Sequence, residues 1–229
     1  MKDKIFRDRL LRWFKGNSRE FPWREKTRTP FQILIAEMLL RKTRAENVVE
    51  VYRSLIRDYP NPKALAGADT RTLEKTLRPL GLFKLRAKAM KGLSKNLVLN
   101  HHAHVPKDYG GLMALPHVGR YAANATLCFA FGERAPIVDA NVQRIYSRIF
   151  GLKKSTEIHR AEHLWNFASK ILPKKAFRDY NLALLDFAAK ICKPNKPVCH
   201  VCFSRDMCRY YNENVPRLVQ HKICGKLHR

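Results

Sequence analysis

Residues 115–142 read LPHVGRYAANATLCFAFGERAPIVDANV and decide the predicted fold. The first five residues, 115–119, form a short apolar segment that a proline interrupts and a glycine closes, and the apolar run 122–131 follows at once. This pattern predicts a helix, a hairpin turn and a second helix. Such a turn directs backbone N–H groups from the start of a helix outward, where they can hold a phosphate. A glycine turn between two helices can equally be a simple connector.

Asp139 is the second informative feature of this stretch. It follows the loop 132–136 and stands where the next helix is expected to begin. Aspartate is a favoured N-cap residue, which explains its place structurally. A capping carboxylate is also held rigidly, so Asp139 is a candidate for both a structural and a chemical role.

The hairpin 115–119 and the segment 138–141 (VDAN) together resemble the signature of the helix-hairpin-helix DNA glycosylase superfamily. The resemblance implies that Asp139 is the catalytic carboxylate and that the hairpin grips DNA. His117 stands where the family usually has glycine. Histidine tolerates left-handed backbone better than most residues, so we expect the turn to be kept with slight strain.

Composition favours a polyanionic partner. Lysine and arginine number 45 against 19 aspartate and glutamate, a formal net charge of +26. Such an excess indicates nucleic acid first and a membrane surface second. No apolar stretch approaches the roughly 20 residues that span a bilayer, and the first residues lack a signal-peptide core. We therefore expect an intracellular protein, cytoplasmic or nucleoid-associated. The resemblance implies a monomer whose partner is double-stranded DNA with a mismatched base.

Apolar residues recur at helical spacing along most of the chain, and no stretch alternates as a strand does, so the predicted fold class is all-α. Helices are expected at residues 3–15, 30–42, 46–59, 69 or 70 to 77, 84–98, 122–131, 156–172 and 175–190. The helix that Asp139 begins is expected to continue over 142–150. The resemblance implies two domains: a six-helix domain with the hairpin at 24–132, and an iron–sulfur cluster domain formed by 1–23 and 133–229.

Glu37 is the only charged residue within 33–40 of an apolar helix. A buried carboxylate has a raised pKa, which suits a general acid. Alternatively, Glu37 pairs with Arg41 on a half-exposed flank. Residues 21–24 (FPWR) and 36–43 (AEMLLRKT) resemble the adenine and thymine mismatch glycosylases, in which this glutamate lies in the base pocket. Adenine glycosylases usually show Gln-Gln-Thr at 41–43, so the basic pair here is closer to the thymine branch.

Other segments are candidates for contact with DNA. The turn at 81–83 resembles the place where relatives insert a wedge side chain into the duplex; that residue is Leu82, which could instead cap the local core. The helix 84–98 has a basic face, either solvated or running along a phosphate backbone. The residues expected to meet DNA are Arg41, Lys42, Thr43, Leu82, His117, Val118, Gly119, Arg120, Lys193 and Lys196.

Four of the six cysteines fall in one window, Cys192, Cys199, Cys202 and Cys208. Four thiolates in one loop can hold zinc or an iron–sulfur cluster. The x6, x2, x5 spacing matches the [4Fe–4S] loop of endonuclease III and MutY-type glycosylases. The resemblance implies a structural cluster that holds a basic loop against phosphates.

The resemblance also implies a mechanism. Glu37 and Tyr121 face Asp139 across a cleft; Asp139 stabilises positive charge on the sugar and activates water, Glu37 protonates the leaving base, and Asn141 holds Asp139. Bifunctional relatives have lysine at position 121, so tyrosine there implies a monofunctional hydrolase of N-glycosidic bonds that leaves an abasic site.

The target base remains open between two branches. The chain ends soon after Cys208, without the further domain that MutY-type adenine glycosylases carry, which favours thymine or uracil opposite guanine. The alternatives are an adenine glycosylase acting on A:G or A:8-oxoguanine, and a non-catalytic DNA-binding protein with a structural metal cluster.

Overall fold

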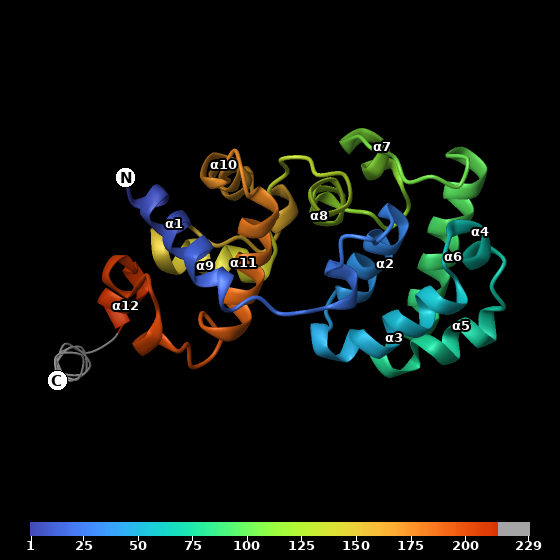
Figure 1. Ribbon diagram of the computed structural model, residues 1–229, viewed down its shortest axis with the longest axis horizontal. Helices are drawn as coiled ribbons and strands as arrows, with labels where there is room; N and C mark the ends of the chain where they lie inside the picture. The colour runs from blue at the N-terminus through green and yellow to red at the C-terminus, as the bar shows by residue number, and fades with distance from the viewer. Residues whose placement is uncertain (215–229) are drawn as a thin grey trace. The chain divides into compact units, whose positions relative to one another are not determined.

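The structure is a computed structural model that describes residues 1–214, and these form helices and no strand (Figure 1). The predicted all-α class is confirmed. Within residues 1–214 the short 3-10 turns are η1 (Pro22–Arg24), η2 (Arg78–Leu80), η3 (Ile158–Arg160), η4 (Cys199–Val201) and η5 (Arg205–Met207). The α-helices of the described residues are α1 (Lys2–Lys15), α2 (Pro30–Leu40), α3 (Ala45–Asp58), α4 (Pro62–Ala66), α5 (Thr70–Leu77), α6 (Phe83–Asn100), α7 (Tyr109–Ala114), α8 (Arg120–Ala130), α9 (Ala140–Phe150), α10 (Glu162–Ile171), α11 (Phe177–Lys190) and α12 (Arg209–Asn214).

Most long helices lie within a few residues of their predicted bounds. The helix predicted at 156–172 is wrong in its first part, where the chain forms η3 before α10 begins. The indole of Trp165 donates to the carbonyl of Ile158 at 2.8 Å, which holds this tight turn against the helix. The short helices α4 and α12 were not predicted, because five or six residues are too few to show a periodic apolar face.

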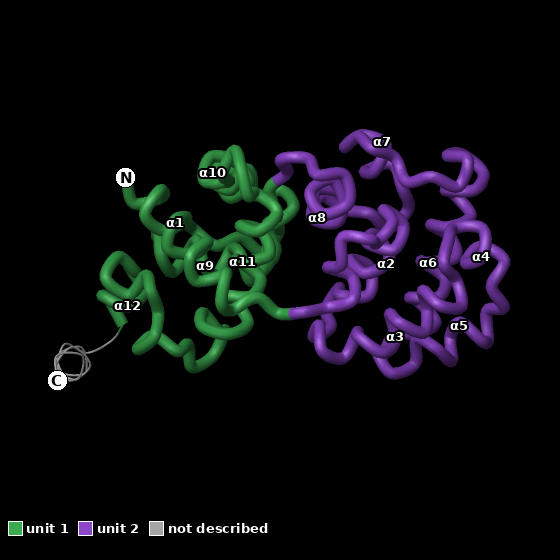
Figure 2. Tube along the Cα trace, viewed as in Figure 1, with its two compact units in different colours: residues 1–19, 136–229 green, residues 20–135 purple. Residues whose placement is uncertain are grey.

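The chain forms two compact units (Figure 2). Unit 1 contains residues 1–19 and the chain from 136 onward; unit 2 contains residues 20–135. The boundaries between the units therefore fall after residues 19 and 135. The predicted domain boundaries fall after residues 23 and 132. Part of the predicted second domain, 215–229, lies outside the described residues.

Unit 2 is built on α2, which packs against α3, α6 and α8. Thr29 begins this helix with a capping box: its Oγ1 accepts from the backbone N–H of Gln32, and the Gln32 side chain accepts from the backbone N–H of Thr29. Pro30 occupies the first helical position, where its missing N–H leaves no hydrogen bond unmade. Eight of the eleven residues of α2 are buried, so this helix forms the centre of the unit.

Unit 1 joins the N-terminal helix α1 to helices of the second half of the chain in one core. Helix α1 packs against α11, and Phe6 places its ring 5.3 Å from Phe150 and 6.4 Å from Phe187. Arg19 donates from its backbone N–H and its Nε to the fully buried Asp186 carboxylate, at 2.9 and 2.6 Å. The N-terminal segment is thus fixed at both of its ends.

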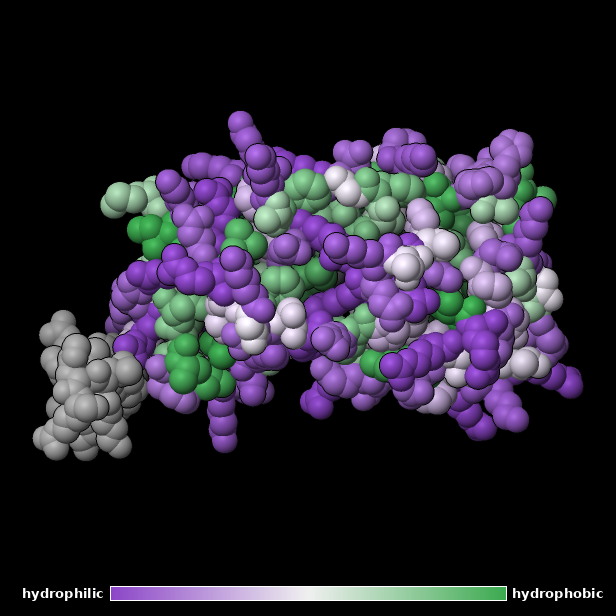
Figure 3. All heavy atoms as spheres, in the orientation of Figure 1, coloured by the Kyte–Doolittle hydropathy of each residue, from purple (hydrophilic) through white to green (hydrophobic). Residues whose placement is uncertain are grey.

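The face of the molecule seen in Figure 3 is mostly hydrophilic, with small separate hydrophobic areas. Among the described residues, no helix combines the length and the apolar character needed to cross a membrane.

Candidate active site

Asp139 begins α9 and is held by three N–H donors of the same turn. Its Oδ1 accepts from the backbone N–H groups of Asn141 and Val142, at 2.9 and 2.8 Å. Its Oδ2 accepts from Nδ2 of Asn141 at 2.7 Å. The predicted N-cap is therefore confirmed. Both oxygens are fixed at the positive end of a helix, so the side chain presents a negative charge at a defined position.

An arginine that the sequence did not single out supports this turn. Arg144 donates from Nη2 to Oδ1 of Asn141 at 3.0 Å, and from Nε to the carbonyl of Cys192 at 2.9 Å. Nη2 also lies 3.3 Å from the carbonyl of Ala188 at the end of α11. Burial lowers the pKa of Arg144. A chain of hydrogen bonds thus joins Asp139, through Asn141 and Arg144, to the first cysteine of the predicted ligand loop.

The four cysteines of that loop line one small cavity of unit 1. Cys192 and Cys208 are buried, and burial raises the pKa of Cys202 to about 12. Burial also raises the pKa of Cys199 and Cys208. Within residues 1–214, no group of three or more histidine, cysteine or acidic residues could hold a metal ion. The cysteines therefore share a cavity without forming the tight cluster that one ion requires.

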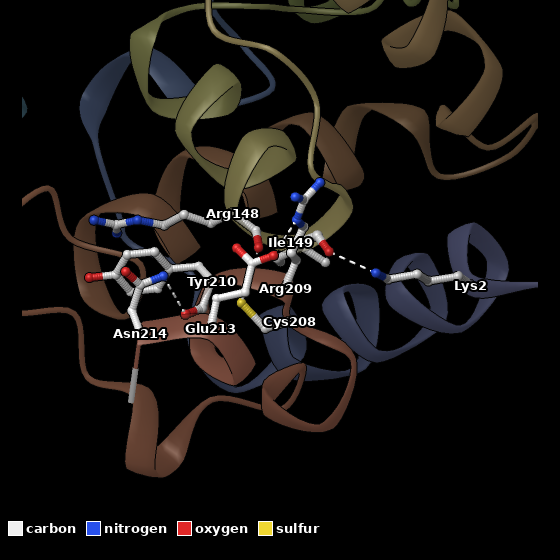
Figure 4. Close-up of polar contacts among 8 residues, drawn as sticks. All are labelled: Lys2, Arg148, Ile149, Cys208, Arg209, Tyr210, Glu213 and Asn214. Carbon is white, nitrogen blue, oxygen red and sulfur yellow. Dashed lines mark hydrogen bonds and ion pairs between the residues drawn. The ribbon is translucent and has the colours of Figure 1, made fainter. Parts of the chain in front are cut away.

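Arg148 holds the cysteine loop against α9. Its Nη1 lies 3.6 Å from Sγ of Cys192 and 2.6 Å from the carbonyl of Lys193. Its guanidinium lies over the ring of Tyr210, 4.6 Å from the centroid (Figure 4). The thiol of Cys208 donates to the Arg148 carbonyl at 3.3 Å. Lys193 and Lys196, predicted to meet phosphates, are exposed on this loop.

Glu37 and Tyr121 belong to unit 2. Glu37 lies on α2 and is only 5% exposed, so the alternative of a half-exposed flank is wrong. Tyr121 is half-buried in the first turn of α8. A buried carboxylate on one helix and an aromatic ring on a neighbouring helix are groups that can bind a nucleobase by hydrogen bonding and stacking.

The hairpin has the predicted form. Helix α7 leads into the turn 115–119, and Gly119 is the N-cap of α8. His117 is exposed and has φ of +64°, the left-handed conformation that its place in a glycine position predicted. The side chain of Val118 is buried, so it fixes the turn in the core, while His117 and Gly119 face solvent.

The other predicted DNA-contact segments are also turns of unit 2. Leu82 is 63% exposed, so the alternative that it caps the local core is wrong. Lys42 has φ of +56°, and the guanidinium of Arg41 donates to the carbonyl of His117 at 3.1 Å. The structure thus joins the segment 41–43 to the hairpin, although 76 residues separate Arg41 and His117 in the chain.

Residues 35–170 match the family described as HhH-GPD superfamily base excision DNA repair protein, and the chain belongs to that superfamily. A thymine/uracil-DNA glycosylase of Pyrobaculum aerophilum is 37% identical over 213 residues, which cover 91% of this chain and 92% of that protein. A thymine-DNA glycosylase of Aeropyrum pernix is 39% identical over 215 residues, which cover 92% and 96%. The solved structure of a thermostable thymine-DNA glycosylase matches with a TM-score of 0.87 and 35% identity, covering 93% of this chain and 97% of that one. The resemblance stated from the hairpin and Asp139 is confirmed.

Proposed function

We propose that this protein is a monofunctional DNA glycosylase of base excision repair. It flips thymine or uracil out of T:G and U:G mispairs, hydrolyses the N-glycosidic bond and leaves an abasic site. The observation that carries the proposal is the Asp139 carboxylate, which three N–H donors fix at the start of α9. The choice of base is supported by the two related glycosylases, which match this chain over most of their length.

The reaction follows from the charges that develop. A base inside a duplex cannot be reached, so the nucleotide is first extruded, at a cost that a mispair lowers. As the bond from sugar to base breaks, its electron pair leaves with the base and the sugar carbon becomes positive. Asp139 stabilises that positive charge and accepts the proton of the attacking water. Glu37 donates a proton or a hydrogen bond to the departing base.

Tyr121 supports a monofunctional reaction. A lysine at this position could attack the sugar carbon and form a Schiff base, which leads to strand cleavage. A tyrosine cannot form that adduct. Water is then the nucleophile, and the strand stays intact until alkali breaks it at the abasic site.

We further propose that Cys192, Cys199, Cys202 and Cys208 hold a [4Fe–4S] cluster. The support is their spacing and the single cavity that all four line. A cubane cluster carries one cysteine on each iron and so accepts sulfurs farther apart than those around one zinc ion. When bound, it supplies covalent bonds that link the segment after α11 to the start of α12, and it takes no part in hydrolysis.

Metal analysis tests the cluster. The purified protein should be brown, with iron and acid-labile sulfide in equal amounts, and Cys202→Ser should lose both. Cys128→Ala is the matched control, because Cys128 is a buried cysteine of unit 2 and its loss should leave the iron content unchanged. Zinc without iron in the wild-type protein contradicts the proposal.

Base release from end-labelled duplexes tests the activity. The panel contains T:G, U:G, A:G and A:8-oxoguanine, with and without alkali. Strand breaks at T:G or U:G only after alkali are expected. Breaks at the adenine pairs would assign the chain to the adenine branch, and no processing of any duplex would favour a non-catalytic DNA-binding protein.

A further inference from the structure

Arg86, in the first turn of α6, donates to two separate segments of unit 2. Its Nε donates to the carbonyl of Gly81 at 3.1 Å. Its Nη1 lies 3.3 Å from the carbonyl of Met38 and 3.1 Å from that of Leu39, and its Nη2 donates to the carbonyl of Arg41 at 3.1 Å. Nη2 also donates to Oγ1 of Thr43 at 2.7 Å. Of the two alternatives for the basic face of this helix, the solvated one therefore does not hold for Arg86.

The chemistry of a helix end explains these contacts. The last carbonyls of α2 have no intrahelical donors, and they lie at the negative end of the helix dipole. The planar guanidinium of Arg86 offers donors in several directions and satisfies them together. Burial, and after it the positive charge of Arg41, lowers the pKa of Arg86. The directed hydrogen bonds offset this repulsion. Arg86 is therefore a fixed structural residue of unit 2 and not a solvated surface charge.

The same contacts fix the left-handed turns. Lys42, with φ of +56°, stands between two acceptors of Arg86, and Leu82, with φ of +49°, follows the Gly81 acceptor. His117, with φ of +64°, accepts from Arg41. A left-handed conformation is strained for a non-glycine residue, because its Cβ lies close to the following carbonyl oxygen. Such conformations persist where the surrounding contacts over-determine them.

We propose that Arg86 is a positioning residue that holds the segment 41–43 and the Leu82 turn in one arrangement, so that Leu82 is presented as a rigid wedge to the duplex. The inference rests on the proposed function. Leu82 and Leu85 are 63% and 66% exposed, although both are large apolar side chains. Apolar side chains inserted between base steps unstack them, and a wedge on a fixed turn does so without first ordering its own backbone.

Two readouts separate positioning from binding. Single-turnover base release from a T:G duplex measures the reaction. The fluorescence of 2-aminopurine beside the mispaired thymine rises when that base step is unstacked. Arg86→Gln should lower the release rate about 10- to 100-fold and abolish most of the fluorescence rise. Its affinity for a fully matched duplex should change less than about threefold, because most of the 45 lysines and arginines that can contact DNA phosphates are not held by Arg86.

A double-mutant cycle tests whether Arg86 acts through Leu82. Leu82→Ala should show the same losses, and adding Arg86→Gln to it should lower the rate less than about twofold further. Arg53→Gln is the matched control, since Arg53 is an exposed arginine of α3 that pairs with Glu50, and it should behave as wild type. The proposal would be overturned if Arg86→Gln lowered the release rate by the same factor in the wild-type protein and in Leu82→Ala. It would also be overturned if Arg86→Gln weakened matched-duplex binding as much as it lowered the release rate.

Arg86→Lys decides the question if the glutamine variant fails to fold. Lysine keeps the charge, but its single ammonium cannot reach both the α2 carbonyls and Gly81. The fluorescence rise should therefore fall by at least about half, in a protein that unfolds like the wild type. A fluorescence rise in Arg86→Lys as large as that of the wild-type protein would overturn the inference. Failure of the wild-type protein to release any base would overturn the proposed function instead.

Discussion

The start of α9 in unit 1 and the end of α2 in unit 2 are held by opposite charges. At the start of α9 the backbone N–H groups of the helix hold the carboxylate of Asp139. At the end of α2 the guanidinium of Arg86 holds the backbone carbonyls. Each charge matches the local end of the helix dipole. In the first case the backbone fixes a reactive side chain, whereas in the second a side chain fixes the backbone turns that are expected to meet DNA.

Asp139→Asn breaks the first of these arrangements and has the largest expected effect. Asparagine caps a helix nearly as well as aspartate, so stability should change by less than about 1 kcal/mol. The negative charge beside the sugar is lost, and single-turnover base release from T:G should fall about 10³-fold or more. Affinity for the duplex, measured by fluorescence anisotropy, should be retained.

The control for this variant is Asp69→Asn. Asp69 caps α5 in the same way and accepts from the backbone N–H of Thr72 at 2.8 Å. The same chemical change there should leave base release unaltered. Equal activity in Asp139→Asn and wild type would remove Asp139 from the reaction.

Arg144→Gln weakens the support behind Asp139 and has a smaller expected effect. Asn141 and Cys192 both lose a donor, so the carboxylate is less well fixed and base release should fall about 10- to 100-fold. Combining this change with Asn141→Ala should give little further loss, because the two residues act in one chain of hydrogen bonds. Single-turnover rates of the two single variants and the double variant measure this coupling. If the rate losses of the two single variants multiply in the double variant, Arg144 acts on the reaction by a route that does not pass through Asn141.

Gly151→Ala alters the far end of α9, where Nζ of Lys2 donates to the carbonyl of Ile149 at 2.7 Å (Figure 4). Gly151 has φ of +78°, and an added Cβ would lie 2.7 Å from Nη1 of Arg209. The Arg209 side chain can move aside, so most of the cost is the left-handed backbone, about 1–2 kcal/mol of unfolding free energy. Chemical denaturation measures it. Gly16→Ala is the control, because its Cβ would meet nothing within 4 Å, and an equal loss there would contradict the argument.

The local features were predictable from the sequence. The Asp139 cap and the left-handed His117 each depend on residues within one or two turns of the chain. The same holds for the long helices, whose buried faces repeat at helical spacing. The unexpected break before α10 depends on Trp165, whose indole bonds back to a carbonyl seven residues earlier.

The non-local features were not predictable. Arg86 stands among four lysines of one helix, and nothing in its spacing distinguishes it. Its acceptors on α2 and the turn after it lie 43–48 residues away in the chain. The acceptors of Arg144 on α11 and the cysteine loop are 44–48 residues away. Backbone carbonyls are the same in every residue, so the sequence does not mark which of them an arginine will reach.

Base release from a T:G duplex, compared between the wild-type protein and Asp139→Asn, tests the role of Asp139 most directly. We predict strand breaks at the thymine only after alkali with the wild-type protein, and almost none with the variant at equal DNA occupancy. Release of thymine at the wild-type rate by Asp139→Asn, or strand breaks without alkali, would contradict a monofunctional reaction that depends on this carboxylate.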